Sequence, residues 1–168
     1  MATTASALTE VLEANRRYAE VFDRSKLASP PARHIAVVAC MDARMHVEEI
    51  MGLRTGDAHV IRNAGGLATE DAIRSLVISY RLLDTREFFI LEHTDCGMLK
   101  FREEEVKQAI AQELGADVSG LRLYPFADLR ENLREQVRLV RESPWIPKDI
   151  PVHGLLYHVE DGRLEQVT

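Results

Sequence analysis

The sequence has little cysteine, no excess of basic residues and no long apolar run. Only two cysteines occur among 168 residues, which excludes a cysteine-rich structural cluster. The 21 Lys and Arg residues are outnumbered by 27 Asp and Glu and are interspersed with them, which argues against a nucleic-acid partner. No apolar run approaches the length of a membrane span, and residues 1–6 lack the charged and apolar regions of a signal peptide. We therefore expect a cytoplasmic protein that binds neither nucleic acid nor a membrane.

The overall composition suits one globular domain over residues 1–168. Hydrophobic residues make up 46% of the chain and charged residues 29%, which is enough apolar material to bury a core. In a reducing compartment, two cysteines are more often metal ligands or catalytic groups than a disulfide. The cysteines are therefore the first candidates for a functional site.

Two apolar stretches each stop abruptly at side chains that bind metals. The first covers residues 36–39 and is followed by Cys40, and the second covers residues 88–91 and leads to His93 and Cys96. Their β-branched and aromatic residues predict buried strands. Functional groups in open α/β sheets collect at the carboxyl ends of the strands. We therefore predict that the three side chains lie together at one edge of a sheet.

The order of the expected elements predicts an α/β fold with a mostly parallel central sheet flanked by helices. A strand over residues 58–62 is followed by Gly65 and Gly66, which indicate a tight turn or a close approach of the backbone. A helix then begins near Glu70 and leads to the strand at residues 88–91, and such a right-handed crossover makes the strands parallel. Further elements are expected as a short helix at 47–51, helices at 103–114 and 126–140, and strands at 152–159 and 164–167 around Asp161-Gly162.

Cys40, His93 and Cys96 offer two thiolates and one imidazole, a set that selects zinc over the cations that prefer oxygen. Structural zinc sites usually have four protein ligands, whereas catalytic sites keep three and leave the fourth position to water. The count of three therefore favours a catalytic site with one Zn²⁺ per chain. The alternative is a buried thiol pair beside a histidine, without metal or as a redox couple.

Asp42 and Arg44 follow Cys40 at intervals of two residues. Asp42 would either occupy the fourth position on zinc or accept a hydrogen bond from the zinc-bound water. Arg44 favours the second role, because a guanidinium binds a carboxylate through two hydrogen bonds and would hold it off the metal. We therefore predict Asp42 and Arg44 as catalytic residues, with Asp42 as the alternative fourth ligand.

A helix over residues 6–22 is predicted at the N-terminus, with Ser6 as its N-cap. Its apolar residues lie on one face, which must pack against something. The sequence leaves open whether this face packs on its own domain or on a partner subunit. The apolar positions are Leu8, Val11, Leu12, Tyr18 and Phe22.

These motifs resemble those of the β-class carbonic anhydrases. Cys-x-Asp-x-Arg at residues 40–44 and His-x-x-Cys-Gly at residues 93–97 match the two metal-binding motifs of that family, and residues 56–66 are similar to its Gly-[Asp/Glu]-x-x-Val-x-Arg-Asn segment. The likeness is close over residues 33–98 and looser elsewhere. The chain is most similar to the compact microbial branch, which also resembles carbonyl sulfide and carbon disulfide hydrolases.

The resemblance implies attack of a zinc hydroxide on CO2, with reversible hydration to bicarbonate and a proton. It also implies a homodimer or tetramer in which the helix over residues 6–22 lies across the partner subunit. In some members the aspartate that matches Asp42 swings onto zinc and closes the site. Two alternatives remain open: hydrolysis of carbonyl sulfide (COS) or carbon disulfide at the same zinc site, and a non-enzymatic zinc-binding or sensing protein. No residue separates CO2 from the sulfur substrates, because pocket width would decide between them.

Other residues near the motifs are weaker candidates. His46 would relay protons from the site, although an ordinary exposed histidine is the favoured interpretation. Core or surface roles are expected for His34, His59, His153 and His158. Met45, Leu67 and Met98 would line a pocket or pack in the core, with neither role favoured.

Overall fold

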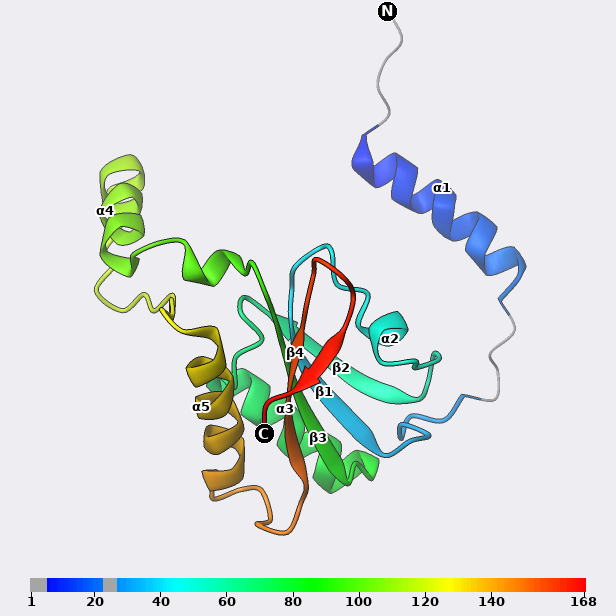
Figure 1. Ribbon diagram of the computed structural model, residues 1–168. Coiled ribbons are helices and arrows are strands. Elements are labelled where there is room, and N and C mark those ends of the chain that lie inside the picture. The colour runs from blue at the N-terminus through cyan, green and yellow to red at the C-terminus, as the bar shows by residue number, and fades with distance from the viewer. Residues whose placement is uncertain (1–5, 23–26) are drawn as a thin grey trace, which may run out of the picture.

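Five strands form one sheet in the order β2-β1-β3-β4-β5 (Figure 1). The computed structural model describes residues 6–22 and 27–168. The first four strands run parallel, and β5 runs antiparallel to β4, so the predicted mostly parallel sheet is confirmed. The strands are β1 (Ile35–Cys40), β2 (Ala58–Asn63), β3 (Glu87–His93), β4 (Val152–Tyr157) and β5 (Leu164–Gln166).

The helices begin and end at residues that suit helix termini. The side chains of Ser6, Thr69 and Asp128 each accept a hydrogen bond from the backbone N–H three residues further on. Gly115 ends its helix in the left-handed conformation, which glycine adopts without strain. The helices are α1 (Ala7–Glu20), α2 (Val47–Ile50), α3 (Glu70–Leu83), α4 (Glu103–Leu114) and α5 (Leu129–Glu142).

Two predicted boundaries are shifted by local hydrogen bonds. The helix predicted over residues 126–140 begins three residues later, because Asp128 caps it and holds the preceding residues in a loop. The strand predicted over residues 152–159 ends at Tyr157. There the chain turns, and the carbonyl of His158 accepts hydrogen bonds from the turn that follows.

Both faces of the sheet are buried, as is usual for parallel strands. On one face, Val38 of β1 packs in a cluster with Leu76 of α3 and Val137 of α5, so these two helices cover that side (Figure 1). On the other face, Val37 packs in a second cluster with Val47 of α2 and with side chains that follow β3. The sheet is therefore a rigid layer from which the ends of β1 and β3 extend into the second cluster.

A buried carboxyl group lies between β3 and α5. Glu92 is 1% exposed, and Nδ2 of Asn132 donates a hydrogen bond to its Oε1 over 2.7 Å. Gln136 donates to Asn132 over 3.1 Å and accepts a hydrogen bond from the N–H of Ala68 over 2.9 Å. The other oxygen of Glu92, Oε2, is buried without a hydrogen-bond partner in the described part of the chain. Burial raises the pKa of Glu92 to about 9, so this carboxyl group is neutral at neutral pH.

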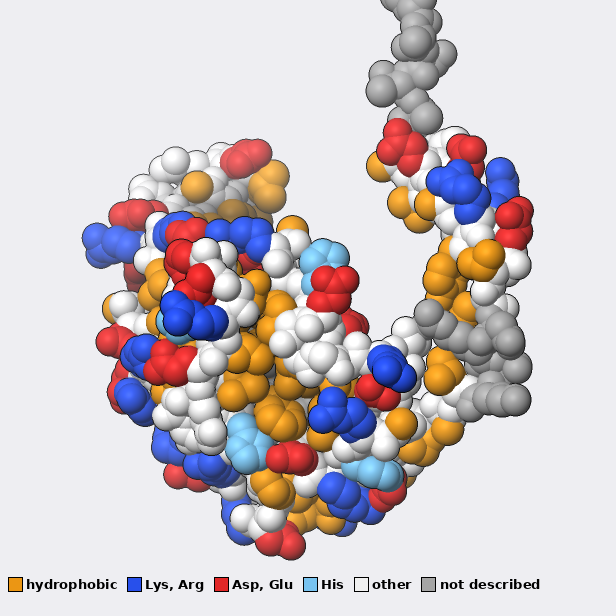
Figure 2. Space-filling view, turned by 45° about the vertical axis from the view of Figure 1, so that its right-hand side comes forward, with side chains coloured by type: hydrophobic (Ala, Val, Ile, Leu, Met, Phe, Trp, Pro, Cys, Tyr) orange, Lys and Arg blue, Asp and Glu red, His pale blue; other side chains and the backbone are white. Residues whose placement is uncertain are grey.

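Helix α1 stands apart from the sheet and buries none of its residues (Figures 1 and 2). Its apolar side chains are exposed, in contrast to those of α3 and α5. The exposed fractions are 67% for Leu8, 63% for Val11, 51% for Leu12 and 49% for Tyr18. Within residues 6–22 and 27–168, no helix combines the length and the apolar character that crossing a membrane would require.

A close backbone contact fixes the turn after β2. Gly66 has a φ of 69°, and a Cβ atom placed on it would lie 2.9 Å from the backbone nitrogen of Cys40 and 2.9 Å from the carbonyl oxygen of Leu91. The turn therefore rests against the backbones of β1 and β3, where only glycine fits. Of the two alternatives that the paired glycines indicated, the structure shows the close approach of backbones.

Gly66→Ala is expected to destabilise the protein by on the order of 3 kcal/mol or more, because a methyl group would press on two strands in a left-handed conformation. Gly52→Ala is the matched control, since Gly52 has a φ of 63° but open space around an added Cβ. This variant should lose only the free energy that the left-handed conformation costs an alanine, about 1 kcal/mol. Urea unfolding of both variants measures the difference, and equal losses would contradict the close contact.

Glu92→Gln is expected to flatten the dependence of stability on pH. In the unfolded chain this carboxyl group ionises near its ordinary pKa of 4.5, whereas the folded protein holds it protonated up to a pKa of about 9. Stability from this group is therefore fully present below the lower value and is lost as pH rises towards the upper one. When the pH is raised from about 5 to about 8, the free energy of unfolding of the wild type should fall, relative to that of the variant, by on the order of 3 kcal/mol.

Urea unfolding at the two pH values provides the measurement. Glu104→Gln removes an exposed carboxyl group of α4 and is the control for loss of a charge. A pH dependence of Glu92→Gln that parallels that of the wild type would show that Glu92 is ionised in the folded protein.

Candidate metal centre

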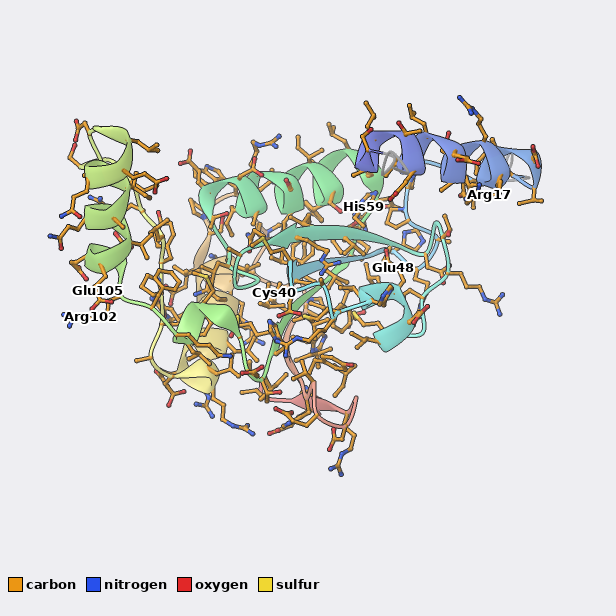
Figure 3. The ribbon with its side chains drawn as sticks, turned by 90° about the horizontal axis from the view of Figure 1, so that it is seen from above. Arg17, Cys40, Glu48, His59, Arg102 and Glu105 are labelled. Atoms are coloured by element: carbon orange, nitrogen blue, oxygen red, sulfur yellow. The ribbon has the colours of Figure 1, made fainter. Side chains whose placement is uncertain are left out.

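Two neighbouring parallel strands bring three metal-binding side chains together. Cys40 is the last residue of β1 (Figure 3). His93 is the last residue of β3, the neighbour of β1 in the sheet. Cys96 lies on the loop after β3, directly before the short 3-10 helix η1 (Gly97–Leu99). All three side chains are buried, and their ligand atoms lie within 4.8 Å of one another. The arrangement is the one that the strand ends predicted.

The hydrogen bond of His93 determines which ring nitrogen faces the cluster. Nδ1 lies 2.8 Å from the carbonyl oxygen of Thr94 and is therefore the N–H donor. Nε2 is left with a lone pair, and it is buried without a hydrogen-bond partner in the described part of the chain. A buried imidazole nitrogen in this state, beside two sulfur atoms, fits a zinc ion by the chemistry of its donors.

The two thiols are coupled to each other. Both cysteines are free, and their Sγ atoms are 4.0 Å apart. A hydrogen bond from Cys96 lowers the pKa of Cys40, whereas the same contact and burial raise the pKa of Cys96. The two thiols together therefore retain one proton. A divalent cation bound to both sulfur atoms would displace that proton.

Arg44 holds the carboxylate of Asp42 beside the three ligands. Nε of Arg44 donates to Oδ1 over 2.9 Å, Nη2 donates to Oδ2 over 2.8 Å, and the backbone N–H of Arg44 donates to Oδ1 over 2.9 Å. These bonds hold the pKa of Asp42 well below its usual range, so it is ionised. Oδ2 lies 3.7 Å from Nε2 of His93. The carboxylate is therefore at the edge of the cluster, in the two-bond contact that the spacing predicted.

Arg62 supports the backbone that carries these groups, a role that the sequence did not reveal. It lies in β2 and donates from Nε to the carbonyl of Cys40 over 3.0 Å and from Nη2 to the carbonyl of Asp42 over 2.7 Å. Asn63 closes the next turn, with hydrogen bonds of 2.7 Å to the carbonyl and from the N–H of Leu67. The family segment at residues 56–66 was the only signal that could have pointed to Arg62.

A second carboxylate binds Arg44 from the side of β3. Oδ2 of Asp95 accepts from Nη1 over 2.8 Å, and the backbone carbonyl of Asp95 accepts from Nη2 over 3.2 Å. Lys100 forms an ion pair with the other oxygen, Oδ1. Lys100 and then Arg44 lower the pKa of Asp95 to about 2. The sequence analysis assigned no role to Asp95 or Lys100.

The remaining histidines lie outside the cluster. His46 is the exposed N-cap residue of α2, without a side-chain capping bond, as the favoured interpretation expected. Each of the other four has a polar partner. His34 contacts Asp84, His59 contacts Ser79, His153 contacts Glu87 and His158 contacts Glu165.

Apolar side chains surround the sulfur atoms. Met45 is 1% exposed and Met98 is 9% exposed, and both belong to the same apolar cluster as Cys40 and Cys96. Leu67 is 5% exposed and packs near Met98 beside Gly65. These three residues therefore give the site an apolar surrounding, whether or not a substrate contacts them.

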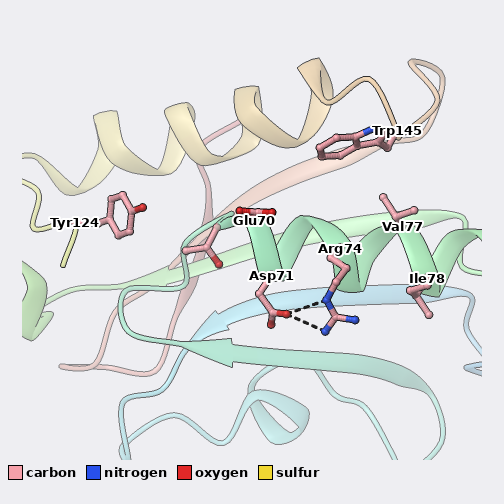
Figure 4. A pocket seen from close by; sticks show the side chains of 8 residues that line it. Glu70, Asp71, Arg74, Val77, Ile78, Tyr124 and Trp145 are labelled. Carbon is pink, nitrogen blue, oxygen red and sulfur yellow. Dashed lines mark hydrogen bonds and ion pairs between the residues drawn. The ribbon is translucent and has the colours of Figure 1, made fainter. Parts of the chain in front are cut away.

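A groove on the surface lies away from these residues. It has a volume of about 590 Å³ and lies between α3 and the segments that carry Tyr124 and Trp145 (Figure 4). The ion pair of Asp71 and Arg74 lies on its side, and none of the three metal-binding residues lines it. Donor chemistry, and not the size of a groove, identifies the functional site here.

Comparisons with known proteins agree with this geometry. A family model described as carbonic anhydrase matches residues 35–164. "Beta-carbonic anhydrase 1" of Mycobacterium tuberculosis is 44% identical over 160 residues, which cover 95% of this chain and 96% of that relative. A "carbon disulfide hydrolase" of Acidithiobacillus thiooxidans is 35% identical over 161 residues, which cover 84% of this chain and 80% of that relative.

The solved structures give the same result. The crystal structure of carbonic anhydrase from Streptococcus mutans matches with a TM-score of 0.91 at 40% identity and covers 99% of this chain and 100% of that one. The residues that the family model matches include Cys40, His93 and Cys96 and the Asp42–Arg44 pair. The chain therefore belongs to the β-class carbonic anhydrase family.

Proposed function

We propose that this protein binds one Zn²⁺ per chain through Cys40, His93 and Cys96 and catalyses the reversible hydration of CO2 to bicarbonate and a proton. The observation that carries the proposal is the unpartnered Nε2 of His93 between two free thiols, with the ionised Asp42 held next to it. The identity of 44% to a β-carbonic anhydrase supports the same reaction.

When bound, zinc supplies the Lewis acidity that lowers the pKa of a water molecule towards neutrality. Asp42 would accept a hydrogen bond from that water, since Arg44 keeps it ionised and 3.7 Å from Nε2 of His93. A fixed acceptor orients the nucleophile toward a substrate held in a defined position. Met45 and Met98 offer an apolar surrounding that suits a small, uncharged, linear molecule. His46, which is exposed, is our candidate for passing the released proton to solvent.

A second candidate activity is hydrolysis of carbon disulfide or carbonyl sulfide at the same site. It is favoured by the 35% identity to a carbon disulfide hydrolase. Both sulfur compounds are linear and apolar like CO2, so the same nucleophile and the same apolar surrounding would serve. The non-enzymatic alternative requires a fourth protein ligand permanently on the metal, and the two hydrogen bonds from the Arg44 side chain to Asp42 argue against that.

We further propose a cytoplasmic homodimer or higher even oligomer. A reducing compartment would keep both cysteines available as thiolate ligands. The apolar side chains of α1 are half exposed or more, and an amphipathic helix is stable only when its apolar face is covered. A partner subunit is the cover that we infer, and a two-fold arrangement would let both helices be covered equally.

Asp42→Asn is expected to lower kcat/KM for CO2 hydration by about 100-fold or more, because the amide cannot act as a charged acceptor for the hydrogen of the nucleophile. Stopped-flow hydration at alkaline pH measures the rate, and metal analysis should find zinc near one per chain in both proteins. Asp71→Asn is the control, since it breaks the exposed ion pair with Arg74 that none of the metal-binding residues shares.

The same assay distinguishes the candidate functions. Negligible CO2 hydration by wild-type protein fully loaded with zinc would refute the proposal. Turnover of carbon disulfide or carbonyl sulfide by that protein would then establish the second activity.

A double substitution, Val11→Asp with Leu12→Asp, is expected to shift the protein from dimer to monomer, because it places charge on the apolar face of α1. Sedimentation velocity measures the change. Arg17→Asp, on the opposite face, breaks only an exposed pair with Glu13 and should leave the oligomer intact. A monomeric wild type, or a dimer that tolerates the double substitution, would contradict the proposed role of α1.

A further inference from the structure

The Asp42–Arg44 pair has a close counterpart in the same chain that lacks its additional contacts. In the turn between β4 and β5, Asp161 and Arg163 have the same spacing, and Arg163 donates from its backbone N–H over 3.1 Å and from Nε over 2.8 Å to the Asp161 carboxylate. The side chain of Arg163 is 82% exposed, and within the described residues its hydrogen bonds go to Asp161. An Asp-x-Arg sequence therefore forms the paired contact without help from other residues. In that case no second hydrogen-bond partner among the described residues holds the arginine in place.

Arg44 differs because Asp95 binds its far side. The guanidinium donates hydrogen bonds from Nε and Nη2 to the carboxylate of Asp42. It also donates from Nη1 to the carboxylate of Asp95 and from Nη2 to the backbone carbonyl of Asp95. Its side chain is 47% exposed, compared with 82% for Arg163. Asp95 lies on the loop that joins His93 to Cys96, so the position of Arg44 is tied to the metal-binding loop.

The charges around Arg44 are balanced so that Asp95 anchors it without depriving Asp42 of a partner. Asp95 alone would compete with Asp42 for the single positive charge. Lys100 pairs with Oδ1 of Asp95, which leaves Oδ2 for Arg44. Two carboxylates thus meet two cations, and the guanidinium remains bound to Asp42 through two parallel hydrogen bonds.

We propose that Asp95 is a positioning residue, which fixes Arg44 where it holds Asp42 in the orientation needed for catalysis and away from the fourth coordination position of the metal. Oδ2 of Asp42 is only 3.7 Å from Nε2 of His93, so a small rotation would bring the carboxylate to the metal. While Asp95 holds Arg44, that rotation must break both hydrogen bonds to the guanidinium. Without Asp95, the long side chain of Arg44 regains its freedom and Asp42 is released more easily.

The backbone of Asp95 allows a conservative test. Its φ is 55°, a left-handed conformation that asparagine tolerates as well as aspartate does. Asp95→Asn therefore keeps the loop while removing the negative charge that binds Arg44 and Lys100. Asp161→Asn is the matched control, because it weakens the equivalent pair away from the metal site.

The proposal rests on the proposed metal site, and cobalt(II) substituted for zinc reports on both. The visible absorption of tetrahedral cobalt depends on its fourth ligand, and titration with thiocyanate measures whether that position is accessible. We expect wild type and Asp161→Asn to bind thiocyanate alike. Asp95→Asn should bind it about tenfold more weakly or worse, because Asp42 then competes for the same position. Adding Asp42→Asn to Asp95→Asn should restore the affinity.

Each outcome has a separate meaning. Equal thiocyanate affinity in wild type and Asp95→Asn would overturn the role of Asp95 and leave the metal site standing. The same holds if Asp161→Asn weakens binding as much as Asp95→Asn does. A wild-type protein that binds no cobalt, or whose spectrum lacks the charge-transfer band of cysteine sulfur, would overturn the proposed metal site and this inference together.

Discussion

The parallel pairing of β1 with β3 is the contact on which the proposed metal centre depends. It sets Ala39 opposite Leu91, so that both strands end at the same edge of the sheet. Because side chains alternate along a strand, a shift of register by one residue would turn Cys40 or His93 to the opposite face. The turn at Gly66 rests against the backbones of both strands, next to Cys40 and Leu91. The sheet therefore sets the positions of Cys40 and His93, whereas the loop after β3 places Cys96.

Charge is arranged differently on the two sides of β3. On the solvent side, Asp42 and Asp95 are ionised because Arg44 and Lys100 bind them. Exposed ion pairs contribute little stability individually, so this network matters mainly because it fixes geometry. On the buried side, desolvation keeps Glu92 protonated, and the nearby Cys40 adds to that effect. Glu92 therefore adds no negative charge beside the two cysteines that we propose as ligands.

Local sequence patterns were sufficient to predict the elements and the first contacts of the site. Two features depend only on near neighbours in the chain and can therefore be predicted from sequence patterns. They are the apolar strands that stop at Cys40 and His93 and the two-residue spacing of Asp42 and Arg44. The contacts of Asp95, Arg62 and Glu92 depend instead on packing between segments far apart in sequence. Arg62 binds carbonyls 20 and 22 residues earlier, and Asn132 binds Glu92 across 40 residues. No periodicity or motif encodes such a distance.

Helix α1 illustrates the same limit from the other direction. Its stripe of apolar residues predicted the helix and its cap correctly, since both are decided within a few residues of Ser6. The stripe also requires a cover, but a pattern within one segment cannot specify which surface provides it. Helices α3 and α5 have comparable stripes and bury them on their own sheet, whereas α1 buries none of its residues. Helix α3 is joined to β2 and β3 by short connections, which favour its packing on the sheet. The apolar face of α1 has no such cover in the described residues, which is why we propose that a second subunit provides it.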